Sequence, residues 1–296
     1  MNAYFNFTLC YQYIRVFVKE ITQKIEKLHY FHIIFTLGDK LVITINNEKI
    51  NNIPVLHISD SAKSEQKLPL ILFVHGFSSA KEHNLHYAYL MAENGFRVIL
   101  PEALYHGERD EGLSEGAMQL HFWDIIINTI SELETIKDSY VKAGLADEDR
   151  IGIAGTSMGG IVTLGALTQY KWIKSAVSLM GMPYYEKFAL AQIDMLKKDG
   201  VEIPLNEEEL EHLMEKIRQL DISMQQDKLA GRPLLFWHGK KDATVPFAPT
   251  YDFYETVKPL YADTPERFQF IADERAGHKV SREGLLQTVQ WFETYL

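Results

Sequence analysis

The sequence predicts an α/β fold, with a mostly parallel central sheet, helices on both of its faces and a helical cap insertion. Three observations lead to this prediction. Short apolar segments of strand length alternate with longer helical ones over most of the chain. Residues 68–76 form a continuous apolar run that ends in glycine, which is typical of a strand buried on both faces. At about 183–228 the alternation is interrupted by two helical patterns with no strand between them.

The composition limits the class of protein. The chain has 296 residues, of which 46% are hydrophobic and 24% charged, as in ordinary globular proteins. Its formal net charge of −10 argues against nucleic acid or an anionic membrane as a partner of the whole surface. Cys10 is the single cysteine, so an internal disulfide is excluded, and we interpret Cys10 as a bystander rather than a nucleophile. The sequence predicts no particular oligomeric state.

Residues 1–40 are predicted to be an N-terminal extension, whose role the sequence does not define. They are rich in Phe, Tyr and Ile and predict an amphipathic helix over roughly 11–28. We interpret this helix as packed on the body or as a poorly ordered extension, and the alternative is an interfacial membrane anchor. No stretch reaches the roughly 20 apolar residues that span a bilayer, and no signal peptide is recognised, so we expect a cytoplasmic protein.

Residues 41–296 form the main predicted domain, which opens with two short β-branched runs. The runs LVITI and IPVLHI are separated by an Asn-rich turn and predict an antiparallel entry to the sheet. The buried strand at 68–76 follows, and then a helix over about 82–94 that ends at Gly95. FRVILPE is the next strand.

The second half of this domain continues the alternation. A long helix is predicted over about 118–142, and the remaining elements are the strand RIGIAG, the helix MGGIVTLGALTQY, the strands IKSAVSLMG, RPLLFWHG and RFQFIAD, and the closing helix REGLLQTVQWFETYL. Two amphipathic helices form the predicted cap at about 183–228. In the second of them, Asn206 and Glu209 have the spacing of a capping box.

Ser157 lies where a predicted strand turns into a predicted helix, within the motif Gly155-Thr156-Ser157-Met158-Gly159. The corner residue of such a turn adopts a strained backbone, and flanking glycines remove the Cβ clashes. The serine side chain is then lifted clear of the sheet at the N-terminus of a helix, where unpaired N–H groups favour a developing anion. The alternative is a glycine-rich turn with a capping serine.

A nucleophilic serine needs a base and an acid that orients the base. In a parallel sheet, both are expected on loops after later strands, in the order serine, acid, histidine. Asp242 follows the strand PLLFWHG and is the favoured acid, while His278 follows the last strand and is the favoured base. Asp273 is the rival acid, although it shares a loop with His278, where bonding to the local backbone is more usual.

Backbone N–H groups are the expected donors to the oxyanion that forms in acyl transfer. Met158 follows the serine and supplies one of them. The other is expected from Phe77, because Gly76 allows a tight turn at the end of the early strand.

Several other residues are weaker candidates. Tyr105 and His106 belong to residues 104–112, which either bind substrate or form a local ion-paired loop. Tyr184, Tyr185 and Phe188 could line a pocket for the substrate, although plain packing is the more common role of an aromatic helix face, as also expected for Phe122 and Trp123. The histidines show no metal-ligand spacing and no nucleotide-binding glycine motif occurs, so neither a metal nor a cofactor is expected.

Four segments together resemble the α/β-hydrolase superfamily, and the detail resembles small bacterial esterases of its dienelactone hydrolase and prolyl-oligopeptidase-like branch. These segments are HGF (75–77), GTSMGG (155–160), HGKKDATVP (238–246) and AGH (276–278). The resemblance implies a serine esterase, with Ser157, Asp242 and His278 as its triad, N–H groups of Phe77 and Met158 as oxyanion donors, and a helical cap over the site.

The expected activity is hydrolysis of small-molecule carboxylic esters with small or medium acyl chains. Dienelactone hydrolases proper use a cysteine where this chain has Ser157. The large prolyl-oligopeptidase-like peptidases carry a propeller domain, for which this chain has no room. The alternatives are a peptidase, thioesterase or acyltransferase that uses the same triad, or a non-catalytic binding module that keeps the fold.

Overall fold

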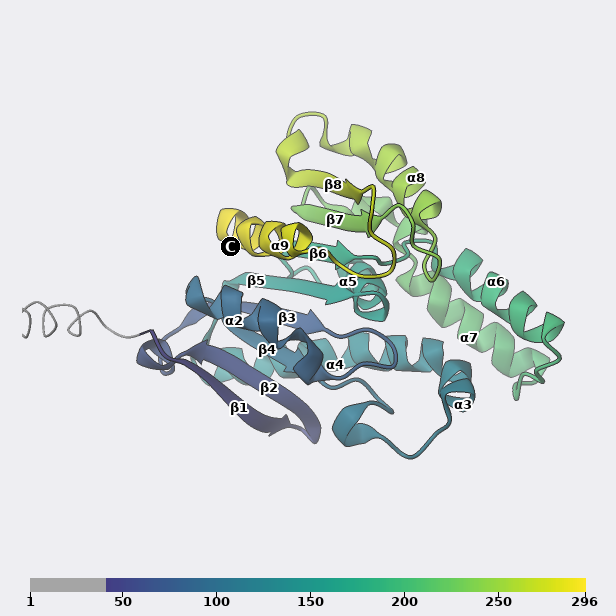
Figure 1. The fold of residues 1–296 in the computed structure, drawn as a ribbon, viewed down its shortest axis with the longest axis horizontal. Coiled ribbons are helices and arrows are strands. Elements are labelled where there is room, and N and C mark those ends of the chain that lie inside the picture. Colours follow the sequence, from purple (N-terminus) through teal and green to yellow (C-terminus); the bar gives the residue numbers. More distant parts are fainter. Residues whose placement is uncertain (1–40) are drawn as a thin grey trace, which may run out of the picture. The chain divides into compact units, whose positions relative to one another are not determined.

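The computed structural model describes residues 41–296, of which Ile43–Leu296 form one compact unit. Its centre is an eight-stranded sheet in the order β1-β2-β4-β3-β5-β6-β7-β8 (Figure 1). The predicted helix over 11–28, Cys10 and the role of residues 1–40 lie outside the described residues. Within them, no helix is long and apolar enough to cross a membrane.

The sheet begins with an antiparallel hairpin, as the sequence predicts. β1 (Ile43–Ile50) pairs with β2 (Ile53–Asp60), and Asn51 and Asn52 connect them with φ angles of 49° and 69°. Two consecutive positive φ values belong to the tight turn that matches the twist of a hairpin, and asparagine tolerates them better than most residues. β2 then pairs antiparallel with β4 (Arg97–Pro101), which attaches the hairpin to the main sheet.

The other neighbouring strands pair in parallel, so their carboxyl ends share one edge of the sheet. They are β3 (Leu68–Val74), β4, β5 (Ala146–Thr156), β6 (Ser175–Leu179), β7 (Leu234–Gly239) and β8 (Phe268–Asp273). All residues of β3, β4, β6 and β7 are buried. This burial explains their continuous apolar runs, because helices cover both faces of a parallel sheet.

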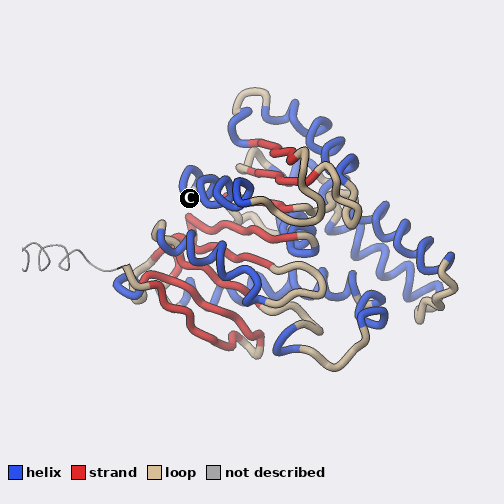
Figure 2. The backbone as a smooth tube through the Cα atoms, viewed as in Figure 1, coloured by secondary structure: helices blue, strands red, loops and turns tan. Residues whose placement is uncertain are grey.

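Helices cover the two faces of the sheet (Figure 2). They enclose two hydrophobic clusters. α4 (Phe122–Lys142) and α5 (Met158–Gln169) pack with the first cluster, and α2 (Leu85–Glu93) and α9 (Arg282–Tyr295) with the second. The predicted α/β class and its mostly parallel sheet are confirmed.

Three helices differ from the prediction. The helix expected over 118–142 is two helices, α3 (Glu115–Leu120) and α4, because the backbone leaves helical geometry at His121 with ψ of 9°. The helix expected over 82–94 begins with a 3₁₀ turn, η2 (Lys81–Asn84), before α2. α8 (Phe247–Val257) occupies a stretch where the sequence predicted no element. Pro246 at its N-cap and Pro249 in its first turn are compatible with a helix, because the first turn has no N–H partner to lose.

The predicted cap consists of α6 (Tyr185–Lys198) and α7 (Glu207–Leu220), which follow β6 and run side by side (Figure 1). The capping box is present at the start of α7. The Asn206 side chain accepts from the N–H of Glu209, and the Glu209 carboxylate accepts from the N–H of Asn206, both at 2.9 Å. Two short 3₁₀ turns, η4 (Ile222–Met224) and η5 (Gln226–Leu229), lead the chain back to β7.

Candidate active site

Ser157 forms the corner between β5 and α5, with φ of 55° and ψ of −114°. This is a strained conformation for a residue with a side chain, and the two neighbouring glycines make it possible. A Cβ on Gly155 would lie 2.3 Å from the carbonyl carbon of Gly159, and one on Gly159 would lie 2.0 Å from the carbonyl oxygen of Val74. Backbone atoms therefore leave no room for a side chain at either of these two glycines.

The structure brings together the three side chains predicted to form a triad. Nε2 of His278 lies 2.8 Å from Oγ of Ser157, and Nδ1 of His278 lies 2.7 Å from Oδ2 of Asp242. With the proton on Nδ1, the ring donates to Asp242 and accepts from the serine hydroxyl. Oδ1 of the buried Asp242 accepts from the N–H groups of Thr244 and Val245, both at 2.9 Å, so its orientation is fixed.

The rival acid, Asp273, bonds to its own loop instead. Its Oδ1 accepts from the N–H groups of Arg275 and Ala276, at 3.0 and 3.1 Å. These contacts lower the pKa of Asp273, led by the hydrogen bond from the Arg275 N–H. His278 makes its carboxylate contact with Asp242 rather than with Asp273.

The loop after β3, which carries the predicted oxyanion donor Phe77, runs directly beside the serine. A Cβ on Gly76, the residue before Phe77, would lie 3.5 Å from Cβ of Ser157. Met158 is the first residue of α5, where its N–H belongs to the unpaired first turn. Ser78, with φ of 58°, turns the chain away and donates its N–H to Nε2 of His106 at 3.1 Å.

A cavity of about 340 Å³ opens beside Ser157. No charged side chain lines it, and its polar lining besides the serine comes from Gln119, Gln192 and Thr244. The rings of Phe77 and Phe122 meet edge to face in its wall, with centroids 5.5 Å apart. The site therefore combines a hydrogen-bonded serine with an apolar space, in the size range of small-molecule sites.

The profile of the prolyl oligopeptidase family matches residues 83–296 of the chain. The chain belongs to the prolyl oligopeptidase family. It is accordingly a serine hydrolase with the α/β-hydrolase fold, which confirms the predicted family resemblance.

Two curated relatives match this prolyl oligopeptidase family member over most of its length. The Bacillus subtilis (strain 168) protein named "Putative esterase YitV" is 54% identical over 255 residues, which are 86% of this chain and 100% of YitV. The protein "Esterase YjfP" of Escherichia coli (strain K12) is 27% identical over 256 residues, again 86% of this chain and 100% of the relative.

A solved structure shows the same fold. TT1662 from Thermus thermophilus superposes with a TM-score of 0.66 at 20% identity, covering 86% of this chain and 98% of its own. At this identity, the likeness concerns the fold.

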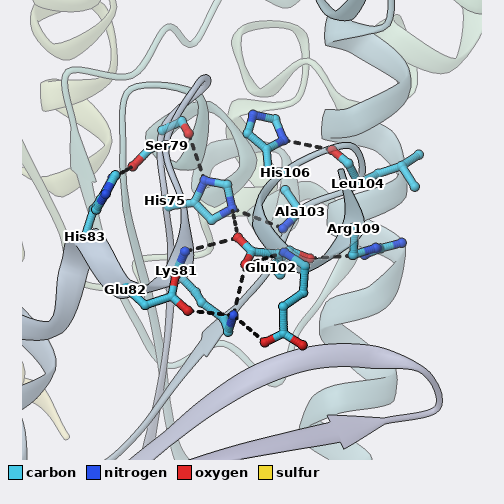
Figure 3. A network of polar contacts seen from close by, with 12 residues as sticks. His75, Ser79, Lys81, Glu82, His83, Glu102, Ala103, Leu104, His106 and Arg109 are labelled. Carbon is cyan, nitrogen blue, oxygen red and sulfur yellow. Dashed lines mark hydrogen bonds and ion pairs between the residues drawn. The ribbon is translucent and has the colours of Figure 1, made fainter. Parts of the chain in front are cut away.

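Lys81 and Glu102 form a buried ion pair at the centre of a network of charged groups in this family member (Figure 3). The carboxylate of Glu102, which follows β4, accepts from the backbone N–H of Lys81 at 3.1 Å and from its ammonium group at 3.0 Å. The same ammonium group donates to Glu108 at 2.8 Å and lies 2.8 Å from a carboxylate oxygen of Glu82. The side chains of Lys81 and Glu102 are fully buried. The network thus ties the loop after β3 to the loop after β4.

The pKa values of this pair follow from these contacts. Burial alone would raise the pKa of Glu102, but its contacts with His75 and Lys81 outweigh burial and lower the pKa to about 2. Burial alone would lower the pKa of Lys81, but hydrogen bonds to Glu108, Glu82 and Glu102 outweigh it and raise the pKa. Both groups are therefore charged at neutral pH.

Residues 104–112 form an ion-paired loop, one of the two predicted alternatives. Arg109 makes a bidentate salt bridge with Glu132, at 2.8 and 2.9 Å. It also donates to the carbonyl of Glu102 at 3.1 Å. His106 is buried, which lowers the pKa of its ring and favours the neutral form that accepts from Ser78. His106 thus supports the Phe77 loop, and it lines an open groove with Ser78 and Ser79 rather than the cavity at Ser157.

The other three predicted substrate-binding residues, Tyr105, Tyr184 and Tyr185, do not line the cavity at Ser157 either. Tyr105 lines the same open groove as His106, and Tyr184 lines a cavity next to the one at Ser157. The prediction for Tyr185 is wrong. Its side chain is fully buried and donates to the carbonyl of Ile161, because this face of α6 packs on the sheet helices rather than on the site.

Some residues that shape the site differ from the expectation or give no signal in the sequence. Phe122 was expected in the core but lines the cavity, whereas its neighbour Trp123 is buried as expected. Gln119 and Gln192 were not singled out, and polar side chains within amphipathic helices give no signal that they face a cavity. In residues 41–296, no group of three or more His, Cys, Asp and Glu side chains is placed to hold a metal ion.

Proposed function

We propose that this serine hydrolase cleaves carboxylic esters of small or medium acyl chains through an acyl-enzyme intermediate. The observation that carries the proposal is the hydrogen-bonded series from Ser157 through His278 to Asp242. Ester hydrolysis is also the activity in the names of YitV and YjfP. The apolar cavity at Ser157, which has no charged lining, supports a neutral acyl group as the part of the substrate that it binds.

In the proposed first half-reaction, His278 takes the proton of Ser157 as Oγ attacks the ester carbonyl. The carbonyl oxygen becomes an oxyanion, which accepts from the N–H groups of Phe77 and Met158. Collapse of this intermediate breaks the bond to the alkoxy oxygen. His278 gives its proton to the leaving alcohol, and the acyl group stays on Oγ.

In the second half-reaction, water takes the place of the alcohol. His278 removes a proton from the water as it attacks the acyl-enzyme carbonyl, and the same N–H groups bind the new oxyanion. Release of the carboxylic acid returns the proton to Oγ. Asp242 keeps the ring of His278 in the tautomer that both half-reactions need and stabilises the imidazolium.

The test of this proposal is the hydrolysis of an aryl ester by the purified protein and by Ser157→Ala. We expect the variant to lose at least about 10⁴-fold in kcat while keeping its fold. Labelling by a fluorophosphonate should depend on Ser157 as well. A variant that retains wild-type turnover would rule out Ser157 as the nucleophile, and an unlabelled, inactive wild type would favour a non-catalytic binding module.

The same triad could serve a peptidase, thioesterase or acyltransferase. Parallel assays with matched ester, thioester and peptide substrates, and with added alcohol as an acyl acceptor, separate these activities. We expect the ester to have the highest kcat/KM. A cytoplasmic location stays a prediction.

A further inference from the structure

A second, smaller cavity of about 50 Å³ lies next to the one at Ser157. The residues around it come from α3, α4, α6, α7 and the connection between the two cap helices. Apart from Gln119 and Gln192, every side chain that lines it is apolar, and none is charged. A chain of methylene groups is the kind of occupant that such a lining favours, because nothing in the lining compensates a buried charge.

The two cavities share part of their walls. Gln119, Phe122 and Gln192 line both. Gln192 is held in place by Trp123, whose Nε1–H donates to its side-chain oxygen at 2.9 Å. The second cavity is therefore adjacent to the site, and the side chains of Gln119, Phe122 and Gln192 stand between the two cavities.

The position of His278 indicates which part of an ester enters these cavities. In the proposed mechanism, His278 protonates the leaving alcohol, so the alcohol must lie beside its ring. His278 is not among the residues that line the cavity at Ser157, whereas Phe77 and Ile161 are. Thr244 and Val245, which donate to Asp242, line the cavity as well, so its assignment to the acyl group rests on the absence of the His278 ring from its lining.

We propose that the two cavities together bind the acyl chain of the substrate, with its far end between α4 and the cap helices. The preferred substrates are then esters of unbranched aliphatic acids of medium length. This inference rests on the proposed function. The narrow second cavity disfavours branched or aromatic acids, and the uncharged linings disfavour acids that carry a second carboxylate.

Leu213 offers a test at one position, because it lines the second cavity and not the first. It is half-buried on α7, where a change of size is tolerated better than in the core. Leu213→Phe should fill the cavity, and Leu213→Ala should enlarge it. Leu190→Phe and Leu190→Ala on α6 are the matched controls, since Leu190 is 49% exposed and lines neither cavity.

The experiment measures kcat/KM for the p-nitrophenyl esters of acetic, butyric, hexanoic, octanoic and decanoic acid. For the wild type, we expect a rise of roughly fourfold per buried methylene group up to hexanoate or octanoate. Leu213→Phe should lower the octanoate-to-acetate ratio by about tenfold or more, and Leu213→Ala should move the optimum to a longer acid. Folding of each variant is checked by thermal unfolding.

A second measurement needs no turnover. Calorimetry gives the affinities for octanamide and acetamide in Ser157→Ala. The same affinities are measured in Ser157→Ala combined with Leu213→Phe and with each Leu190 change. We expect the Leu213 change to weaken octanamide binding about tenfold and the Leu190 changes to leave it unaltered. If the wild type cleaves no ester, the proposed function fails, and this measurement alone decides whether the cavities bind an alkyl chain. Equal chain-length profiles and equal octanamide affinities with and without the Leu213 changes would overturn the inference.

Discussion

The carboxylate of Glu102 accepts hydrogen bonds from both the backbone N–H and the ammonium group of Lys81, at 3.1 and 3.0 Å. Lys81 follows the loop that carries Phe77, and Glu102 begins the loop after β4, so the pair joins two loops at the carboxyl edge of the sheet. Because the pair is buried, it fixes the Phe77 loop without contact to the substrate. We therefore interpret Glu102 as a positioning residue.

Replacing Glu102 by Gln should affect the chemical step more than substrate binding. The variant leaves Lys81 with a weaker buried partner and loosens the Phe77 loop, so we expect kcat to fall by roughly 10- to 100-fold with KM nearly unchanged. Stability should fall by about 3 kcal/mol. The measurements are steady-state kinetics and the affinity for an alkyl trifluoromethyl ketone, which forms an oxyanion on Ser157. An unaltered affinity for the ketone in a slower enzyme would argue against the positioning role.

The same carboxylate should contribute to the acid sensitivity of the fold. Its pKa is lowered from the ordinary value of 4.5 to about 2, so between these values the unfolded chain binds a proton that the folded chain does not. The stabilisation is therefore complete above pH about 4.5 and is lost as the pH falls toward about 2. Urea unfolding of the wild type and of Glu102→Gln should show a stability gap that narrows below pH 4.5, and a constant gap would contradict this expectation.

The two aspartates near His278 should differ sharply in their effect on activity. Asp242→Asn keeps the shape of the side chain but permits the wrong tautomer of His278, so kcat should fall by about 10⁴-fold. Asp273→Asn changes only a loop contact and should keep most of the activity. The comparison is made with the same aryl ester at pH 7 and above. A larger loss of kcat in Asp273→Asn than in Asp242→Asn would make Asp273 the acid of the triad instead.

Gly155, two residues before Ser157, should tolerate no side chain. A Cβ on Gly155 would lie 2.3 Å from a backbone carbon, which cannot move aside as a flexible side chain could. We expect Gly155→Ala to cost about 3 kcal/mol or more, measured by the yield of soluble protein and by Tm. Gly277→Ala is the control, since its Cβ would have its nearest neighbour at 3.5 Å and should change stability by about 0.5 kcal/mol or less.

Tyr185 should matter for stability and not for the substrate. Tyr185→Phe removes the hydroxyl that donates to the Ile161 carbonyl, at a cost of about 1 kcal/mol. Because the ring lies in the core, KM for every ester in the chain-length series should match that of the wild type. A selective change in KM for longer esters would place this ring in the acyl site instead.

The sequence by itself determined the fold class and pointed to Ser157, Asp242 and His278 as three residues that meet at the carboxyl ends of the strands. The alternation of apolar strands and helices is a property of neighbouring residues, and so is the need for glycine on both sides of Ser157. The order of serine, acid and base along the chain follows from parallel strands whose ends share one edge. The first two features depend on local geometry, which short stretches of sequence carry, and the third on the parallel arrangement that the alternation itself predicts.

Only the tertiary structure decided which side chains surround the site. Tyr184, Tyr185 and Phe188 looked equivalent in the sequence, but successive residues of a helix point about 100° apart, and the packing of α6 buries Tyr185 in the core while Phe188 lines the cavity. Lys81 and Glu102 meet because β3 and β4 are neighbours in the sheet. Contacts of this kind depend on the relative positions of whole elements, which the pattern of any one segment does not encode.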